Sequence, residues 1–200
     1  MKVEAGTVTI VRITGIEASH SLDPIRVTLD DIEPGKGRIN IEFWGRAWAS
    51  YWGGMGQKTI DQFFTSCDND YLIQNLTSGK SVDRTRYSAE ALASFARKTI
   101  CLRRRWRDIG TRINYDSLDR DAARKLFDAA EDLESCETQE SCWQESRLLT
   151  KIFGEEWFCC LGSESEERNP EYDYLDRICT VVREALRQLP AVATQQEVAA

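Results

Sequence analysis

Residues Gly37–Trp52 read GRINIEFWGRAWASYW, and this stretch decides the fold. Apolar and polar side chains alternate on both sides of Gly45-Arg46, which is the pattern of two neighbouring β-strands. We expect Gly45-Arg46 to be a two-residue hairpin loop, because glycine supplies the positive φ that a type II′ turn requires at its first central position. This register pairs Phe43 with Trp48, Ile41 with Ser50 and Ile39 with Trp52. One face of the hairpin is then apolar and requires a cover.

The chain around this hairpin predicts further strands, because β-branched and apolar residues again alternate with polar ones. The candidate strands are Val8–Ile13, Ile25–Leu29 and Ile39–Phe43. Turn signals separate them, with Asp23-Pro24 before the second strand and the stretch EPGKG at 33–37 before the third. Links this short favour an antiparallel meander, because parallel strands need a crossover of about a dozen residues or more.

Helical periodicity begins near Thr59, and Thr59 and Asp68 are the expected N-caps of two short helices. Apolar stripes predict further helices over Ser88–Ile100, Asp116–Leu133, Trp143–Phe153 and Tyr172–Leu186, and Pro190 is expected to end the last one. The predicted class is α+β, with an N-terminal antiparallel meander of three or four strands and helices packed on one face. We expect a single domain over 1–189, with the sheet in about 1–58 and the helices in about 59–189, and a disordered tail at 190–200.

The composition indicates a protein that is neither inserted into a membrane nor exported. The 200 residues are 42% hydrophobic, which is enough to bury one substantial core. No run approaches the ~18 consecutive apolar residues of a membrane span. The start, MKVEAGTVTI, lacks the charged-then-apolar order of a signal peptide. We therefore expect the protein to work in the cytoplasm.

The cysteines and the histidine predict neither a metal site nor a catalytic pair. The 7 cysteines are odd in number and lack the C-x-x-C spacing of zinc sites, so reduced thiols are expected. The single histidine, His20, has no local Cys or Asp at the spacing of a catalytic partner. We expect no enzyme activity, no cofactor and no metal, and assign no catalytic residue.

The net charge of −7 hides a segregation along the chain. Residues Arg97–Arg107 contain six bases and no acid, Asp128–Glu145 contain seven acids and no base, and Glu155–Asp173 contain seven acids against Arg168 alone. The basic run is a candidate for nucleic-acid contact through Arg103, Arg104, Arg105 and Arg107, although on a helix these side chains spread around the cylinder. We favour pairing of this run with the acidic stretches of the same chain or of a second copy.

The acidic stretches have an alternative interpretation, in which they imitate the phosphate spacing of nucleic acid and occupy a basic groove on another protein. Electrostatic complementarity would then supply speed and specificity of association. Charge runs are more often solvated helix faces, and that is the interpretation we favour.

Two aromatic residues are candidates for partner binding. In the predicted hairpin Trp48 and Trp52 lie on the apolar face, whereas Trp44 and Tyr51 fall on the opposite face. If no element covers that face, Trp44 and Tyr51 form an exposed aromatic patch, and such patches often mark partner sites in soluble proteins.

A glycine loop follows the hairpin, formed by Gly53, Gly54, Gly56 and Lys58. The order strand, glycine loop, helix is typical of phosphate sites, because free N–H groups at a helix N-terminus attract anions. A P-loop needs glycine directly before Lys-Ser/Thr, but Gln57 stands before Lys58. A tight connection between the last strand and the first helix is therefore the favoured interpretation.

A set of short motifs carries a resemblance to a known group of proteins. The motifs are Leu22-Asp23-Pro24-Ile25-x-Val27, Pro34-Gly35-x-Gly37, Trp48-x-x-Tyr51-Trp52-Gly53-Gly54-Met55-Gly56, Phe63-Phe64-x-Ser66-Cys67-Asp68-x-x-Tyr71-Leu72-x-x-Asn75-Leu76, and Asn169-Pro170-Glu171-Tyr172-x-Tyr174-Leu175-x-Arg177-Ile178. Over residues 22–76 and the last helix, the chain resembles a group of uncharacterised bacteriophage and prophage proteins. The resemblance implies a phage gene product working inside a bacterial cell, and it carries no catalytic residues to transfer.

Three functional hypotheses follow. The leading one is a phage-encoded accessory protein that binds, and thereby blocks, a bacterial host macromolecule, with a host protein as the expected partner. The first alternative is a nucleic-acid-associated protein that uses the Arg97–Arg107 helix. The second is a small enzyme that binds a phosphate ligand in the Gly53–Lys58 loop. Oligomeric state is left open by the sequence.

Overall fold

The computed structural model describes residues 3, 6–16, 24–77, 80–105 and 117–198, and within it the chain divides into two compact units. The sheet unit comprises residues 1–83 and 170–200, and the helical insert comprises residues 84–169. Where the sequence predicts one domain over 1–189, the chain thus has two separate cores. His20, Arg107 and Asp116, which the sequence-based predictions name, lie outside the described residues.

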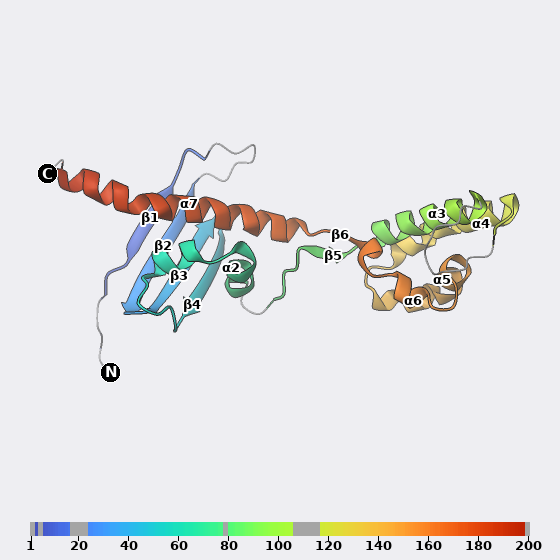
Figure 1. The fold of residues 1–200 in the computed structure, drawn as a ribbon, viewed down its shortest axis with the longest axis horizontal. Coiled ribbons are helices and arrows are strands. Elements are labelled where there is room, and N and C mark those ends of the chain that lie inside the picture. Colours follow the sequence, from blue (N-terminus) through green and yellow to red (C-terminus); the bar gives the residue numbers. More distant parts are fainter. Residues whose placement is uncertain (1–2, 4–5, 17–23, 78–79, 106–116, 199–200) are drawn as a thin grey trace. The chain divides into compact units, whose positions relative to one another are not determined.

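The sheet unit contains the predicted antiparallel meander. Strands β1 (Thr9–Ile13), β2 (Ile25–Glu33), β3 (Lys36–Phe43) and β4 (Arg46–Trp52) form one sheet in the order β1-β2-β3-β4 (Figure 1). Alternation places Ile25, Val27, Ile39 and Ile41 on one face, where each is fully buried, as expected for a sheet covered on one side. This confirms the α+β class and the meander.

The hairpin register differs from the prediction by two residues. Phe43 pairs with Arg46, Ile41 with Trp48, and Ile39 with Ser50. The two-residue loop is therefore Trp44-Gly45, not Gly45-Arg46, and the predicted type II′ turn is wrong. Both loop residues have positive φ, 47° for Trp44 and 73° for Gly45, which is the signature of a type I′ turn. Because side chains alternate with period two, a shift of two residues leaves the apolar face of each strand unchanged.

Three helices cover the apolar face of the sheet: α1 (Ile60–Ser66), α2 (Asn69–Leu76) and α7 (Pro170–Val198). Thr59 and Asp68 are the N-caps of α1 and α2, as predicted, and the Tyr71 N–H donates to Asp68 Oδ1 at 2.8 Å. Helix α7, drawn in red, lies across the strands (Figure 1) and buries its apolar stripe there, namely Leu175, Ile178, Cys179, Val182 and Leu186.

The end of α7 differs from the prediction of a helix that stops at Pro190 before a disordered tail. The helix runs through Pro190 to Val198. A proline inside a helix removes one backbone donor, but its φ near −65° is helical, so the helix can continue past it at some cost.

A partly buried polar contact joins α2 to α7. Asn69 Nδ2 donates to Asp176 Oδ1 at 2.7 Å and to Thr180 Oγ1 at 2.9 Å, while Asn69 Oδ1 accepts from Arg183 at 2.6 Å. Arg183 also donates to the carbonyl oxygen of Cys67 at 2.6 Å. One amide side chain therefore ties the start of α2 to two turns of α7, more than a hundred residues later in the chain.

The helical insert contains α3 (Ala89–Arg105), α4 (Arg120–Ala129), α5 (Ser146–Phe153) and α6 (Trp157–Cys160), with the 3-10 helices η1 (Ala130–Ser135), η2 (Glu140–Glu145) and η3 (Ser163–Ser165). The helix predicted over Asp116–Leu133 is α-helical from Arg120 and tightens to η1 at Ala130. The helix predicted from Trp143 is η2 there and becomes α-helical at Ser146. The core of the helical insert includes Leu92, Ile100, Leu133, Leu149 and Ile152.

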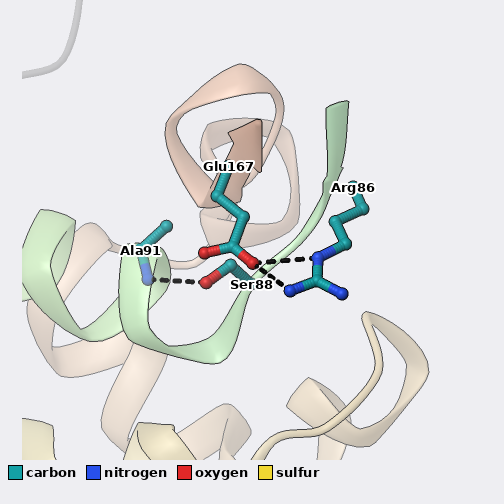
Figure 2. Close-up of polar contacts among 4 residues, drawn as sticks. All are labelled: Arg86, Ser88, Ala91 and Glu167. Atoms are coloured by element: carbon teal, nitrogen blue, oxygen red, sulfur yellow. Dashed lines mark hydrogen bonds and ion pairs between the residues drawn. The ribbon is translucent and has the colours of Figure 1, made fainter. Parts of the chain in front are cut away.

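The chain enters and leaves the insert through two short paired strands, β5 (Thr85–Tyr87) and β6 (Glu166–Arg168), which we call the neck. Figure 2 shows Arg86 donating to Glu167 from Nε and from a terminal guanidinium nitrogen, at 2.9 and 2.6 Å. Ser88 lies beside them and accepts from the Ala91 N–H at 3.2 Å, capping α3. Arg86 and Ser88 lower the pKa of Glu167 by hydrogen bonding to its charged form.

All 7 cysteines are free thiols, as expected. Burial raises the pKa of Cys136 to about 11 and that of Cys179 to about 12, so both act as neutral core residues. No helix among the described residues is both long and apolar enough to cross a membrane.

Candidate functional site

Trp44 at the tip of the β3–β4 hairpin is the most unusual residue of the sheet unit. The shift in register moves it from the predicted sheet face into the turn, where its side chain is 76% exposed. Its φ of 47° is left-handed, a region that costs a residue with a Cβ about 1–2 kcal/mol. Its ring touches that of Phe43 at 6.0 Å between centroids. A bulky aromatic residue therefore occupies a position that asparagine or glycine would fill with less strain.

A cleft of about 380 Å³ adjoins Trp44, and its walls include Arg12, Arg26, Glu42 and Arg46. Arg12 lies directly opposite Arg26 on β1 and β2, and like charges in that arrangement repel. Arg26 lies 3.8 Å from Glu42 in an exposed ion pair. The described lining of the cleft thus contains three guanidinium groups and one carboxylate, which makes it a local positive site on a protein of net charge −7.

Arg46 is held at the edge of this cleft by aromatic rings. Its guanidinium lies 5.7 Å from the ring centroid of Trp48 and 5.9 Å from that of Tyr174 on α7. Burial raises the pKa of the Tyr174 phenol, so the ring beneath Arg46 is neutral. These contacts restrict Arg46 and keep its charge near Trp44.

Tyr51 does not join Trp44 in a single patch. It is 52% exposed on the outer face of β4, as predicted, but it pairs with Arg38 near the other end of the strand. The five steps along β4 from Arg46 to Tyr51 span about 16 Å at 3.3 Å per residue, and Trp44 lies beyond Arg46 in the turn. The Tyr51 ring lies over Gly53, where a Cβ would be 3.2 Å from the phenol oxygen. The two predicted residues are therefore separate features.

The glycine loop at Gly53–Lys58 is closed against the rest of the sheet unit. Met55 is buried and its N–H donates to the carbonyl oxygen of Gly35 at 2.8 Å. A carboxylate already occupies the start of α1, because the Ile60 N–H donates to Asp31 Oδ1 at 2.7 Å. Lys58 Nζ donates to Ser66 Oγ at 2.9 Å, at the far end of α1. The geometry favours the tight connection and gives the phosphate hypothesis no support.

The predicted basic residues on α3 have different environments. Arg103 donates to the carbonyl oxygens of Lys151 and Ile152 at 2.6 and 3.0 Å, where its charge caps the C-terminus of α5. Arg104 and Arg105 are exposed. Arg97 forms an ion pair with Glu134 at 3.1 Å, which is one instance of the expected pairing between the basic run and an acidic stretch.

A groove of about 460 Å³ runs along α3 and reaches α4. It is lined by Arg97, Lys98, Leu102, Arg105 and Phe127, together with Ser94 and Cys101. The α3 members recur every three or four residues, so they share one face of the helix. The same spacing can be recognised in the sequence. Arg97, Lys98 and Arg105 share this face of α3, whereas Arg103 and Arg104 do not line the groove.

Two groups of exposed residues were assigned no functional role from the sequence. Arg12, Arg26 and Arg46 reach the Trp44 cleft from three strands, and strand alternation shows only that Arg12 and Arg26 face away from the core. Trp143 and Phe158 on the insert are 61% and 51% exposed. No cluster of three metal-binding side chains occurs within the described ranges.

The arrangement defines an α+β protein of two units, with a one-sided antiparallel sheet and a helical insert joined through a two-stranded neck. The chain belongs to a bacteriophage protein family: a family model described as "Phage family" matches residues 1–188. The match confirms the predicted phage resemblance and includes the insert. No curated protein and no solved structure matches the chain.

Proposed function

We propose that this phage protein is an accessory protein that binds a bacterial host protein through Trp44 and the adjoining arginine cleft, and that it acts by blocking that partner in the host cytoplasm. The observation that carries the proposal is Trp44 itself, an exposed tryptophan in a left-handed turn position. Strained residues that the surrounding structure holds in place cluster at functional sites.

The residue types around Trp44 match those that contribute most to protein interfaces. Tryptophan and arginine dominate binding hot spots, and both lie at this tip. The cleft favours an acidic protein surface, because Arg12, Arg26 and Arg46 outnumber Glu42. Glu42 would repel a continuous phosphate backbone laid through the cleft, whereas a folded protein surface can leave a gap or place a donor there.

In this proposal the Trp44 cleft binds a partner protein and catalyses no reaction. Among the described residues that line the cleft, the ionisable side chains are three arginines and Glu42. Guanidinium groups stay protonated in proteins and so cannot exchange a proton with a substrate at neutral pH. The cleft therefore presents charge and an aromatic ring rather than an acid–base pair.

The test is Trp44→Asn, which converts the turn to Asn-Gly, the preferred type I′ sequence. We expect the variant to be more stable than the wild type by about 1 kcal/mol, because the strain is relieved, and to lose its partner. Tagged wild-type and variant proteins would be compared by pull-down from nuclease-treated host lysate and by urea denaturation. Tyr51→Ala is the matched control, because it removes an exposed ring near the far end of β4 from the turn.

A stoichiometric host protein that is lost with Trp44→Asn and kept with Tyr51→Ala would support the proposal. Partner retention by Trp44→Asn, or no partner in any permissive host, would refute it. A loss of stability in Trp44→Asn would show that Trp44 serves the fold instead.

A second candidate function is nucleic-acid binding through the α3 groove, favoured by the stripe Arg97, Lys98 and Arg105 beside the exposed ring of Phe127. It predicts retardation of a labelled single-stranded oligonucleotide at low salt, where phosphate contacts are strongest. Lys98→Glu with Arg105→Glu should abolish the shift. Absence of a wild-type shift at low salt would remove this candidate.

A further inference from the structure

The helical insert carries an exposed aromatic cluster that shares no residue with the α3 groove. Trp143 packs edge-on against Trp157 with ring centroids 4.8 Å apart, and stacks with Phe158 at 6.2 Å. Trp157 is buried and anchors the cluster, whereas Trp143 is 61% exposed and Phe158 is 51% exposed. Two large rings thus present their surfaces to solvent from a fixed base.

Carboxylates precede both of these rings closely in the sequence. Glu140 precedes Trp143 by three residues in η2, and side chains three apart lie along the same edge of a 3-10 helix. Glu155 and Glu156 immediately precede α6, which carries Trp157 and Phe158. The run Asp128–Glu145 contains no base. Within the described part of the chain, no ion pair joins Glu140, Glu155 or Glu156 to a basic side chain.

We infer that the acidic aromatic patch, formed by Trp143, Phe158, Glu140, Glu155 and Glu156, binds an arginine-rich segment of a partner protein. A guanidinium group stacks on an indole face through its planar charge, and tryptophan is the strongest such acceptor. Carboxylates at the rim bind the edges of the same group through its fixed donors. The patch differs in position and in charge from the Trp44 cleft, so the inference is independent of the function proposed above.

Arginine is the expected residue because the patch offers both a flat aromatic surface and hydrogen-bond acceptors. Lysine is a compact, strongly hydrated charge that stacks less well. An acidic partner is disfavoured by like-charge repulsion. A purely apolar partner would leave the carboxylates at the rim without favourable contacts.

The experiment is isothermal titration calorimetry of the full-length protein with octa-arginine and octa-lysine peptides at physiological salt. We expect octa-arginine to bind more tightly than octa-lysine. Trp143→Ala should weaken octa-arginine binding at least about tenfold, the effect of losing a partly desolvated cation–π contact. Phe158→Ala provides a second variant of the patch, and both rings are exposed enough that the fold should survive, as circular dichroism would verify.

A matched pair of charge variants separates the patch from general attraction to an acidic protein. Glu155→Gln should weaken binding, whereas Glu184→Gln, which removes the same charge from the exposed face of α7, should not. Equal losses in these two variants, equal binding by Trp143→Ala and the wild type, or no binding of octa-arginine would each overturn the inference.

A second copy of this chain is the other candidate occupant, through its α3 groove. Sedimentation of the wild type, Trp143→Ala and Lys98→Glu tests it. A dimer that dissociates in both variants would assign the patch to self-association and overturn the arginine-rich partner, and a monomer would favour that partner.

Discussion

The sheet unit and the helical insert are stabilised by contacts of different range. The sheet unit is discontinuous, because α7 returns after the insert to cover strands near the start of the chain. The insert has a core made within 84–169 alone. The stability of the sheet unit therefore depends on α7 at the other end of the chain, whereas the stability of the insert depends on residues 84–169 alone. We expect that mutations can destabilise each unit separately.

Removal of α7 should have the largest effect. A chain ending at Asn169 loses six buried side chains from the sheet core, at about 2 kcal/mol each, which is comparable to the whole stability of a domain. We expect the sheet unit to unfold and the insert to stay folded. Amide NMR spectra would show loss of the strand signals with retention of dispersed insert signals. If the signals of both units stayed dispersed, the sheet unit would not depend on α7.

Asn69→Ala should have the next largest effect, confined to the sheet unit. The variant removes donors to Asp176 and Thr180 and an acceptor for Arg183, which should lower the free energy of unfolding by about 2–3 kcal/mol. Urea denaturation measures this.

Asn75→Ala is the control for Asn69→Ala, because Asn75 Nδ2 donates to Tyr71 O on an exposed helix surface. It should change the free energy of unfolding by less than about 1 kcal/mol. A similar effect of both substitutions, or a shift in the transition of the insert, would contradict the assignment.

Excision of the insert should have a smaller effect on the sheet unit. The Asn169 N–H donates to the carbonyl oxygen of Arg84 at 2.9 Å, so the two ends of the insert lie close together. Joining Asp83 to Pro170 with Gly-Ser-Gly should change the free energy of unfolding of the sheet unit by about 1 kcal/mol or less, because the insert folds on its own core. Chemical denaturation checks this, and failure of the shortened chain to fold would show that the sheet unit needs the insert.

The neck should show the smallest effect, as a local dependence on pH. Hydrogen bonds from Arg86 and Ser88 lower the folded-state pKa of Glu167, so the interaction stabilises the neck above the unfolded-state pKa of about 4.3. It is lost as the pH falls through the folded-state value. Hydrogen-exchange protection of the Ser88 and Asn169 amides, corrected for intrinsic rates, should fall below about pH 4.

Glu167→Gln provides the control for the neck. Its protection of the Ser88 and Asn169 amides should not change over the same pH range, because glutamine does not titrate. The same pH dependence in the wild type and in Glu167→Gln would assign the effect to another group.

The candidate sites contain features that could be predicted from the sequence and others that could not. Alternation placed both Trp44 and Tyr51 opposite the apolar face, and both side chains are exposed. The turn that makes Trp44 strained depends on a register difference of two residues, which alternation cannot detect because it leaves each face unchanged. Arg103 reads as a surface cation, but it caps α5 because the insert folds back on itself.

The sequence by itself determined the features set by near neighbours: the four-stranded meander, its apolar face, and the caps at Thr59 and Asp68. These depend on side-chain periodicity and on backbone groups within a few residues. Tertiary structure alone decided the two-unit division, the arginine cleft and the Asn69–Arg183 contact. Each of these depends on residues that are distant in the chain, whose meeting is selected by the packing of the whole core rather than by any local pattern.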